Sequence, residues 1–247
     1  MDEIVQQLWL GLQETANNSS PLQDLTAADS PLNLFVFFVQ WSAVVLSALA
    51  GLYAARNRGM DVYGALVIAF IVPLGGGTLR DLLLGRYPIF WIAEPVYAVT
   101  VVVIAFTSLF VGFEAKRSQT AARVAQPVAR ITDDRSTLYL IVDSLALGLW
   151  AYLGTLYALQ MGTPPVVAPI MGVITASFGG VLRDLFFARV PQSFMPSQLY
   201  ALAAAAGAIV YVLLWGLGVG NTASFLACFG LTFSIRITSV KLNIQSR

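Results

Sequence analysis

The strongest constraint on the fold of this chain is a stretch that occurs twice. Residues 75–88 read GGGTLRDLLLGRYP, and residues 178–191 read FGGVLRDLFFARVP. Each copy carries an Arg-Asp pair shortly after its run of adjacent glycines. The same shift also superposes Tyr97 on Tyr200 without a gap. A match of this length between two apolar segments indicates an internal duplication.

The composition places the duplicated chain in a membrane. Hydrophobic residues make up 57% of the sequence and charged residues 11%, whereas soluble domains carry about 25% charged residues. The chain contains no histidine, so a Ser-His-Asp triad and a histidine-containing zinc site are excluded. Cys228 is the only cysteine and has no partner for an intramolecular disulfide. We therefore expect an all-α integral membrane protein that is not an enzyme, with no cofactor, no metal site and no nucleic-acid partner.

Uncharged runs of about 20 residues, the length that spans a bilayer, predict seven transmembrane helices. These runs cover residues 31–55, 61–85, 92–112, 137–159, 166–188, 196–216 and 221–237. The predicted organisation is an N-terminal tail (1–30), a first three-helix repeat (31–112), a basic loop (113–136), a second three-helix repeat (137–216), and a seventh helix with the C-terminal tail (217–247).

Loop charges predict the orientation, because cytoplasmic loops are enriched in Lys and Arg. Basic residues gather on one side of the predicted helices: Arg56, Arg58, Lys116, Arg117, Arg123, Arg130, Arg135, Arg189, Arg236, Lys241 and Arg247. That side is predicted to be cytoplasmic, with the N-terminus outside and the C-terminus inside. Since each repeat has an odd number of helices, the second repeat is predicted to be inverted relative to the first. The loop 113–136 is expected to attract anionic lipid, although the positive-inside rule alone explains its charge.

The repeated glycines are candidates for a pore hinge. Pro73 and the glycines predict that the second and fifth helices are interrupted, and such a break persists only inside protein or beside a wet cavity. Freed carbonyl oxygens at such breaks suit a cation. Close packing of the two helices is an equally good interpretation of small residues, and both can hold. The candidate hinge residues are Gly75, Gly76, Gly77, Gly179 and Gly180.

The Arg-Asp pairs place four charges in or near the hydrocarbon: Arg80, Asp81, Arg183 and Asp184. Each costs about 2.5 to 3.5 kcal/mol there unless it is paired or hydrated. Neighbouring helical residues point about 100° apart. The two members of a pair are therefore expected to bond across the repeat axis or to neighbouring helix ends. A structural ion pair and a lining of the route are the two alternatives.

Further polar residues are candidates for the route itself. Asp143 occupies the position that Gln40 holds in the first repeat, so it could attract cations at a vestibule or hydrogen-bond a neighbouring helix. Uncharged oxygens could be offered by Thr78, Ser144, Tyr152, Thr175 and Ser177. Each of these hydroxyls is also consistent with ordinary packing between helices.

The doubled GG-x-x-R-D motif, the Arg-x-Pro that follows it and the segment Asn57–Asp61 resemble the trimeric intracellular cation (TRIC) channel family. The sequence resembles the prokaryotic branch of this family more closely, and that branch is linked to glycine uptake in some bacteria. The resemblance implies a seven-helix protomer, a homotrimer and one potassium-permeable pore through each protomer. It also implies that the second and fifth helices bend at the glycine motifs. Phe178 replaces the first glycine in the second copy, so the two bends need not be equal.

These observations favour a monovalent-cation channel in a prokaryotic inner membrane, with K⁺ as the permeant ion. A carrier or channel for a small neutral solute such as glycine is the main alternative, because inverted repeats with broken helices also occur in secondary transporters. A membrane scaffold that conducts no ions is the third possible function.

Overall fold

The computed structural model describes residues 31–117, 137–194, 199–242 and 244, and this part of the chain is all-helical. The tail 1–30 and residues 118–136 of the basic loop lie outside the described residues. The helices are α3 (Pro31–Asn57), α4 (Val62–Leu84), α5 (Phe90–Ala93), α6 (Val96–Arg117), α8 (Thr137–Gln160), α9 (Val167–Phe186), α10 (Tyr200–Gly216) and α11 (Asn221–Lys241), with a 3-10 turn at Gln192–Phe194.

The ends of α4 follow from its capping residues. Asp61 is extended, and its Oδ1 accepts a hydrogen bond of 2.8 Å from the Gly64 amide, as an N-cap side chain does. Gly85 follows the helix in the left-handed conformation, with φ of 65°, which closes the C-terminus. The predicted bounds of the second helix are confirmed.

The third predicted helix is two helices. A short α5 ends at Ala93, and α6 begins at Val96. Glu94 between them is extended, as expected before Pro95, because a proline ring disfavours helical geometry at the preceding residue. The predicted start at Ile92 was therefore wrong, and α6 also continues past the predicted end at Gly112.

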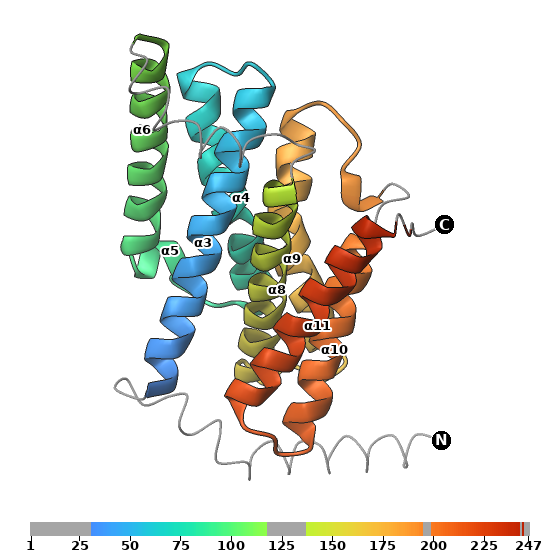
Figure 1. Ribbon diagram of the computed structural model, residues 1–247. Coiled ribbons are helices and arrows are strands. Elements are labelled where there is room, and N and C mark those ends of the chain that lie inside the picture. Colours follow the sequence, from blue (N-terminus) through green and yellow to red (C-terminus); the bar gives the residue numbers. More distant parts are fainter. Residues whose placement is uncertain (1–30, 118–136, 195–198, 243, 245–247) are drawn as a thin grey trace.

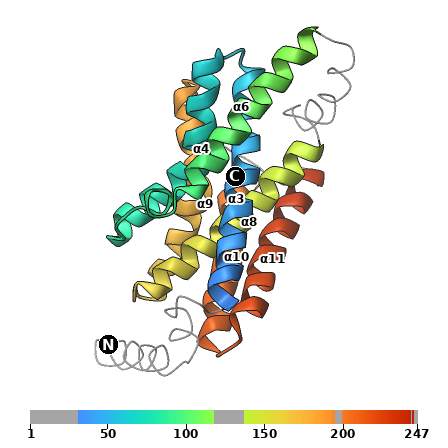
Figure 2. The same cartoon turned by 90° about the vertical axis from the view of Figure 1, so that its left-hand side faces the viewer.

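The long helices alternate in direction. In Figure 1, α3, α6, α9 and α11 run upward, and α4, α8 and α10 run downward. Figure 2 looks onto the left-hand side of that view, where α6 lies on the outside of the bundle. Pairs α4 with α9 and α3 with α8 are in contact and join the two halves of the chain.

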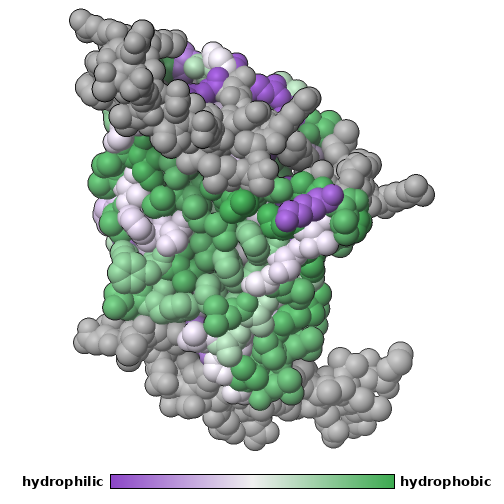
Figure 3. Space-filling model, in the orientation of Figure 1, coloured by the Kyte–Doolittle hydropathy of each residue, from purple (hydrophilic) through white to green (hydrophobic). Residues whose placement is uncertain are grey.

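The surface is that of a membrane protein. Five described helices, α3, α4, α8, α9 and α11, are long and apolar enough to cross a bilayer, while α10 and the stretch Val96–Ser108 of α6 are shorter apolar helices. Figure 3 shows a broad apolar band around the visible face. Large exposed apolar side chains include Val99, Val103, Phe106, Ile209, Leu213 and Leu226. The multi-pass membrane fold is confirmed.

Candidate functional site

The centre of the bundle is a close crossing of α4 and α9 at one glycine from each repeat. A Cβ atom added at Gly76 would collide with the carbonyl oxygen of Thr175, and one added at Gly179 would collide with the carbonyl oxygen of Val72. The two contacts are reciprocal, since residues 72 and 76 lie as far apart as 175 and 179. Both backbones touch here, which is possible only without side chains at these positions.

The other three candidate hinge glycines do not join this contact in the same way. A Cβ at Gly75 would meet the Leu182 side chain at 2.7 Å, and one at Gly77 would meet the Phe90 ring. A Cβ at Gly180 would have only the Arg183 guanidinium nearby, at 3.8 Å. The five glycines therefore have different environments, and close packing accounts for Gly76 and Gly179 most directly.

The predicted interruption of the two helices is wrong. Helical structure is continuous from Val62 to Leu84 and from Val167 to Phe186. Pro73 lies inside α4 and lacks the N–H that the carbonyl of Ala69 would otherwise accept. One missing hydrogen bond does not end the helix here, because α3, α8 and α9 pack around it and hold the remaining turns in place.

A polar cavity of about 30 Å³ lies beside the glycine crossing. Apolar and backbone surfaces from α4 and α9 form part of its wall, including Pro73, Gly76, Gly179 and Gly180. Its polar side chains are Ser47, Asp143, Trp150, Thr175 and Tyr200. This volume holds roughly two water molecules, each of which needs at least about 10 to 15 Å³. A carboxylate, hydroxyl oxygens and an indole N–H thus meet in one small space between the repeats.

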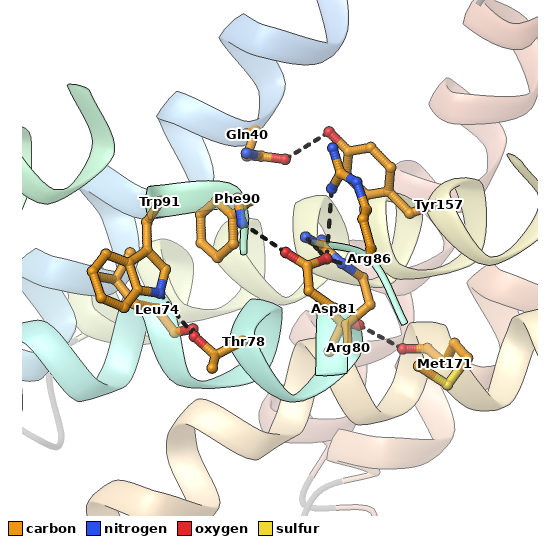
Figure 4. Close-up of polar contacts among 11 residues, drawn as sticks. Gln40, Leu74, Thr78, Arg80, Asp81, Arg86, Phe90, Trp91, Tyr157 and Met171 are labelled. Carbon is orange, nitrogen blue, oxygen red and sulfur yellow. Dashed lines mark hydrogen bonds and ion pairs between the residues drawn. The ribbon is translucent and has the colours of Figure 1, made fainter. Parts of the chain in front are cut away.

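Figure 4 shows the first Arg-Asp pair, which is fully buried. The Nε of Arg80 donates to Oδ1 of Asp81 at 2.8 Å, and the backbone N–H of Phe90 donates to Oδ2 of Asp81, also at 2.8 Å. Arg86 Nη1 lies 3.5 Å from the same carboxylate. Both guanidinium groups lie over the Tyr157 ring in cation–π contacts. Arg80 Cζ is 4.4 Å and Arg86 Cζ is 4.2 Å from the ring centroid.

The second copy repeats this arrangement near the opposite end of the bundle. Arg183 Nε lies 3.0 Å from Asp184 Oδ1, and Arg189 Nη2 lies 2.7 Å from the same oxygen. Arg183 also donates to the hydroxyl of Tyr139 at 3.1 Å.

The adjacent Arg and Asp therefore bond to each other, which was not predicted. Of the two predicted alternatives, a bond across the repeat axis was wrong, whereas Asp81 does bond a neighbouring helix end, the N–H of Phe90 at the start of α5. Although their Cβ atoms point apart, the long Arg80 and Arg183 side chains curl back to the next residue. The carboxylates of Asp81 and Asp184 are held at the same time by an arginine that follows the helix end. This geometry is that of a structural ion pair.

The remaining polar candidates are mostly used within the protein. Three hydroxyls donate to the backbone carbonyl one turn earlier: Thr78 to Leu74, Thr175 to Met171 and Ser177 to Val173. The Tyr152 hydroxyl is 2.9 Å from the Asn221 side-chain amide nitrogen at the start of α11. The Ser144 hydroxyl is buried without a hydrogen-bond partner among the described residues. Of these five, only Thr175 lines the cavity.

Some residues at the site were not predicted. Trp150 Nε1 donates to the hydroxyl of Ser47 at 2.9 Å, and these residues are separated by the repeat shift itself. A search for equivalent positions that could bond across the repeat axis would have identified this pair. Tyr200 appeared only as a repeat match, and Arg236 only as a basic residue near a helix end. Arg236 Nη2 lies 4.0 Å from Asp143 Oδ2.

Comparisons with known proteins agree with this architecture. The family model described as "Glycine transporter" matches residues 37–112 and 140–216, one segment in each half. The UPF0126 membrane protein of Vibrio cholerae is 28% identical over 221 residues, which is 89% of this chain and 84% of that protein. The UPF0126 inner membrane protein YadS of Escherichia coli is 29% identical over 178 residues, covering 72% of this chain and 78% of the relative.

The same fold occurs in a solved structure. The TRIC trimeric intracellular cation channel orthologue from Rhodobacter sphaeroides is 31% identical and superposes with a TM-score of 0.72, over 85% of this chain and 99% of that chain. Because the family model matches both halves, and because sequence identity and fold agree over most of the chain, the protein belongs to the prokaryotic branch of the TRIC family.

Proposed function

We propose that the protein is a channel for monovalent cations, potassium foremost, with one pore through each protomer of a homotrimer. The observation that carries the proposal is the polar cavity at the glycine crossing, where the Asp143 carboxylate lies among hydroxyl oxygens between the repeats. A carboxylate that lines a cavity inside a membrane protein favours a cation beside it. The Rhodobacter sphaeroides relative of the same fold is described as a trimeric cation channel, which supports the ion class and the trimer.

The glycine crossing is the gate of the proposed pore, and the present conformation is closed. The contacts of Gly76 and Gly179 with the opposite backbone leave no space for an ion at that point. Opening would require α4 and α9 to separate by bending near the glycine motifs. Pro73 facilitates a bend in α4, because it has already removed one helical hydrogen bond there.

The two halves form inverted repeats in this proposal, with seven spanning helices once α6 and α10 are counted. The reciprocal contacts of Gly76 and Gly179 support a pseudo-two-fold axis, as does the bond between Ser47 and Trp150. The excess of Lys and Arg at one end supports an external N-terminus and a cytoplasmic C-terminus. An inner membrane location is supported by the Escherichia coli relative.

Transport of a small neutral solute such as glycine is the second candidate. The name of the matching family model favours it. The Asp143 carboxylate in the cavity lining opposes it, since a negative charge there favours a cation over a solute with no net charge.

Recording from the purified protein in planar bilayers under a K⁺/Na⁺ gradient tests the proposal. The wild type should give discrete cation currents, and Asp143→Asn should lower them while still assembling, because it removes the cavity carboxylate and leaves the glycine crossing intact. Asp61→Asn is the matched control, because it makes the same change at an exposed position outside the cavity, where Asn also caps α4, and it should conduct like the wild type. Silent bilayers together with saturable uptake of labelled glycine into the same protein's liposomes would replace the channel with a carrier.

A further inference from the structure

The seventh helix reaches the cavity that the repeats enclose. Arg236, near the C-terminal end of α11, lies 4.0 Å from the Asp143 carboxylate, and its Cζ lies 5.0 Å from the centroid of the Tyr200 ring. Asp143 and Tyr200 both line the cavity. An arginine from outside the duplication is thus positioned at the one carboxylate that would attract a cation there.

The ion pair of Arg236 is looser than the other arginine pairs of the site. Its N–O distance of 4.0 Å compares with 2.8 Å for Arg80 and Asp81 and with 2.7 Å for Arg189 and Asp184. The Arg236 and Asp143 side chains are 12% and 15% exposed, whereas Arg80 and Asp81 are fully buried. The longer distance means a weaker attraction between the two charges, so a cation in the cavity can compete with Arg236 for the carboxylate.

The two repeats differ at this position. Gln40 stands where Asp143 would be in the first repeat, and its amide oxygen accepts a 2.8 Å hydrogen bond from the Tyr157 hydroxyl. Gln40 itself carries no charge, so its position has no counterpart of the pair between Asp143 and Arg236. The carboxylate and the α11 arginine are therefore an addition to the duplicated framework at one end only.

Elsewhere α11 is firmly attached to the bundle. Asn221, at its first turn, bonds the hydroxyls of Tyr152 and Tyr211. A Cβ at Gly207 of α10 would collide with Thr232 of α11, so the two helices touch closely along their middle. This attachment keeps the backbone of α11 beside the bundle, so the Arg236 side chain remains within reach of the cavity.

We propose that Arg236 is a tethered counter-ion that competes with permeating cations for Asp143 and so limits the current. The proposal rests on the cation-channel function proposed above. While the guanidinium stays beside the carboxylate, the local potential is nearly neutral, and a cation gains little by entering. Without the Arg236 charge, Asp143 attracts cations more strongly, although Arg183 still acts on it, and the local cation concentration rises.

The test is the unitary K⁺ current of Arg236→Gln in planar bilayers. Loss of one unit charge near the route should raise this current about threefold at low salt, with a smaller increase at high salt because mobile ions screen the charge. Arg236→Lys keeps the charge and should stay close to the wild type. Lys241→Gln is the matched control, because it removes the same charge from an exposed position on the same helix, and its current should not change.

The outcomes separate the two proposals. An Arg236→Gln protein that assembles and carries wild-type current would overturn the counter-ion role, and so would a rise in the Arg236→Lys current equal to that of the glutamine variant. If Arg236→Gln does not assemble, Asp143→Asn/Arg236→Gln is compared with Asp143→Asn. The double variant should carry the larger current, and equal currents would overturn the proposal. Absence of current from the wild type would instead refute the channel function.

Discussion

At the scale of single residues, the repeated motif builds the same helix end twice. Arg86 N–H bonds the carbonyl of Asp81, and Gly85 N–H bonds that of Leu82. This is the Schellman pattern, with a left-handed residue just past the helix. In the second copy Arg189 and Ala188 make the equivalent bonds to Asp184 and Leu185. Conserving this end in both copies keeps each Asp carboxylate within reach of the following arginine.

The left-handed position is Gly85 in one helix end and Ala188 in the other, so the two ends can be compared by exchanging these residues. Gly85 has φ of 65°, while Ala188 has φ of 52° and carries a Cβ that disfavours this conformation. We expect Gly85→Ala to lower the free energy of unfolding by about 1 kcal/mol and Ala188→Gly to raise it by about 0.5 to 1 kcal/mol. Unfolding of the purified protein in mixed detergent would measure both changes.

Open space around Gly85 isolates the conformational effect, since no atom lies within 4 Å of an added Cβ. Gly216→Ala serves as the control, because Gly216 also has open space but lies within α10. Its substitution should leave stability unchanged or slightly higher. Equal effects at Gly85 and Gly216 would contradict the role of the left-handed backbone.

At the scale of helices, stability and the proposed gate depend on the same contact. We expect Gly76→Ala and Gly179→Ala each to destabilise the protein by about 1 to 3 kcal/mol or more, because each methyl group would displace the opposite backbone. Gly180→Ala should stay within about 0.5 kcal/mol of the wild type, because an added Cβ there has only the Arg183 side chain nearby, at 3.8 Å. The change in stability of all three variants can be measured by heating each protein and monitoring its unfolding by size-exclusion chromatography.

The comparison with Gly180 separates packing from flexibility. If glycines are needed at this crossing only for backbone flexibility, Gly180→Ala should be as harmful as Gly179→Ala, since the two positions are neighbours on one helix. Equal losses of stability would therefore refute the packing explanation.

Helix bounds could be predicted from the sequence because they depend on local signals. The bounds of α4 were predicted to within one residue at each end from Asp61, Gly85 and the mostly apolar run between them. Contacts that depend on side-chain reach could not be predicted in this way. The bond between Arg80 and Asp81 contradicts the simple rule of helical directions, and the continuity of α4 across Pro73 depends on neighbours that the sequence does not place.

At the scale of the whole molecule, the site is assembled from both repeats and α11, although only the repeats carry a recognisable motif. The duplication predicted which residues of α4 and α9 matter, since the equivalent glycines Gly76 and Gly179 each contact the opposite backbone. It could not predict Arg236, which has no counterpart in the other half. From the sequence alone, the positive-inside rule was enough to explain the charge of Arg236. Only the folded structure places that charge beside Asp143.

The same view of the molecule predicts that the two halves can assemble as separate chains. Contacts between them within the bundle include the Gly76 and Gly179 crossing and the bond of Ser47 with Trp150, and none of these requires residues 118–136. The covalent connection favours assembly mainly by lowering the entropy cost of bringing the two halves together. This entropy cost changes slowly with loop length.

Residues 1–127 and 128–247, expressed together, should therefore co-purify through a tag on one half and give the wild-type cation current. Gly179→Ala in the second half should reduce co-purification much more strongly than Gly180→Ala, because only the former disturbs the backbone contact. Halves that each reach the membrane without associating would show that the covalent connection, rather than the glycine crossing, holds the repeats together.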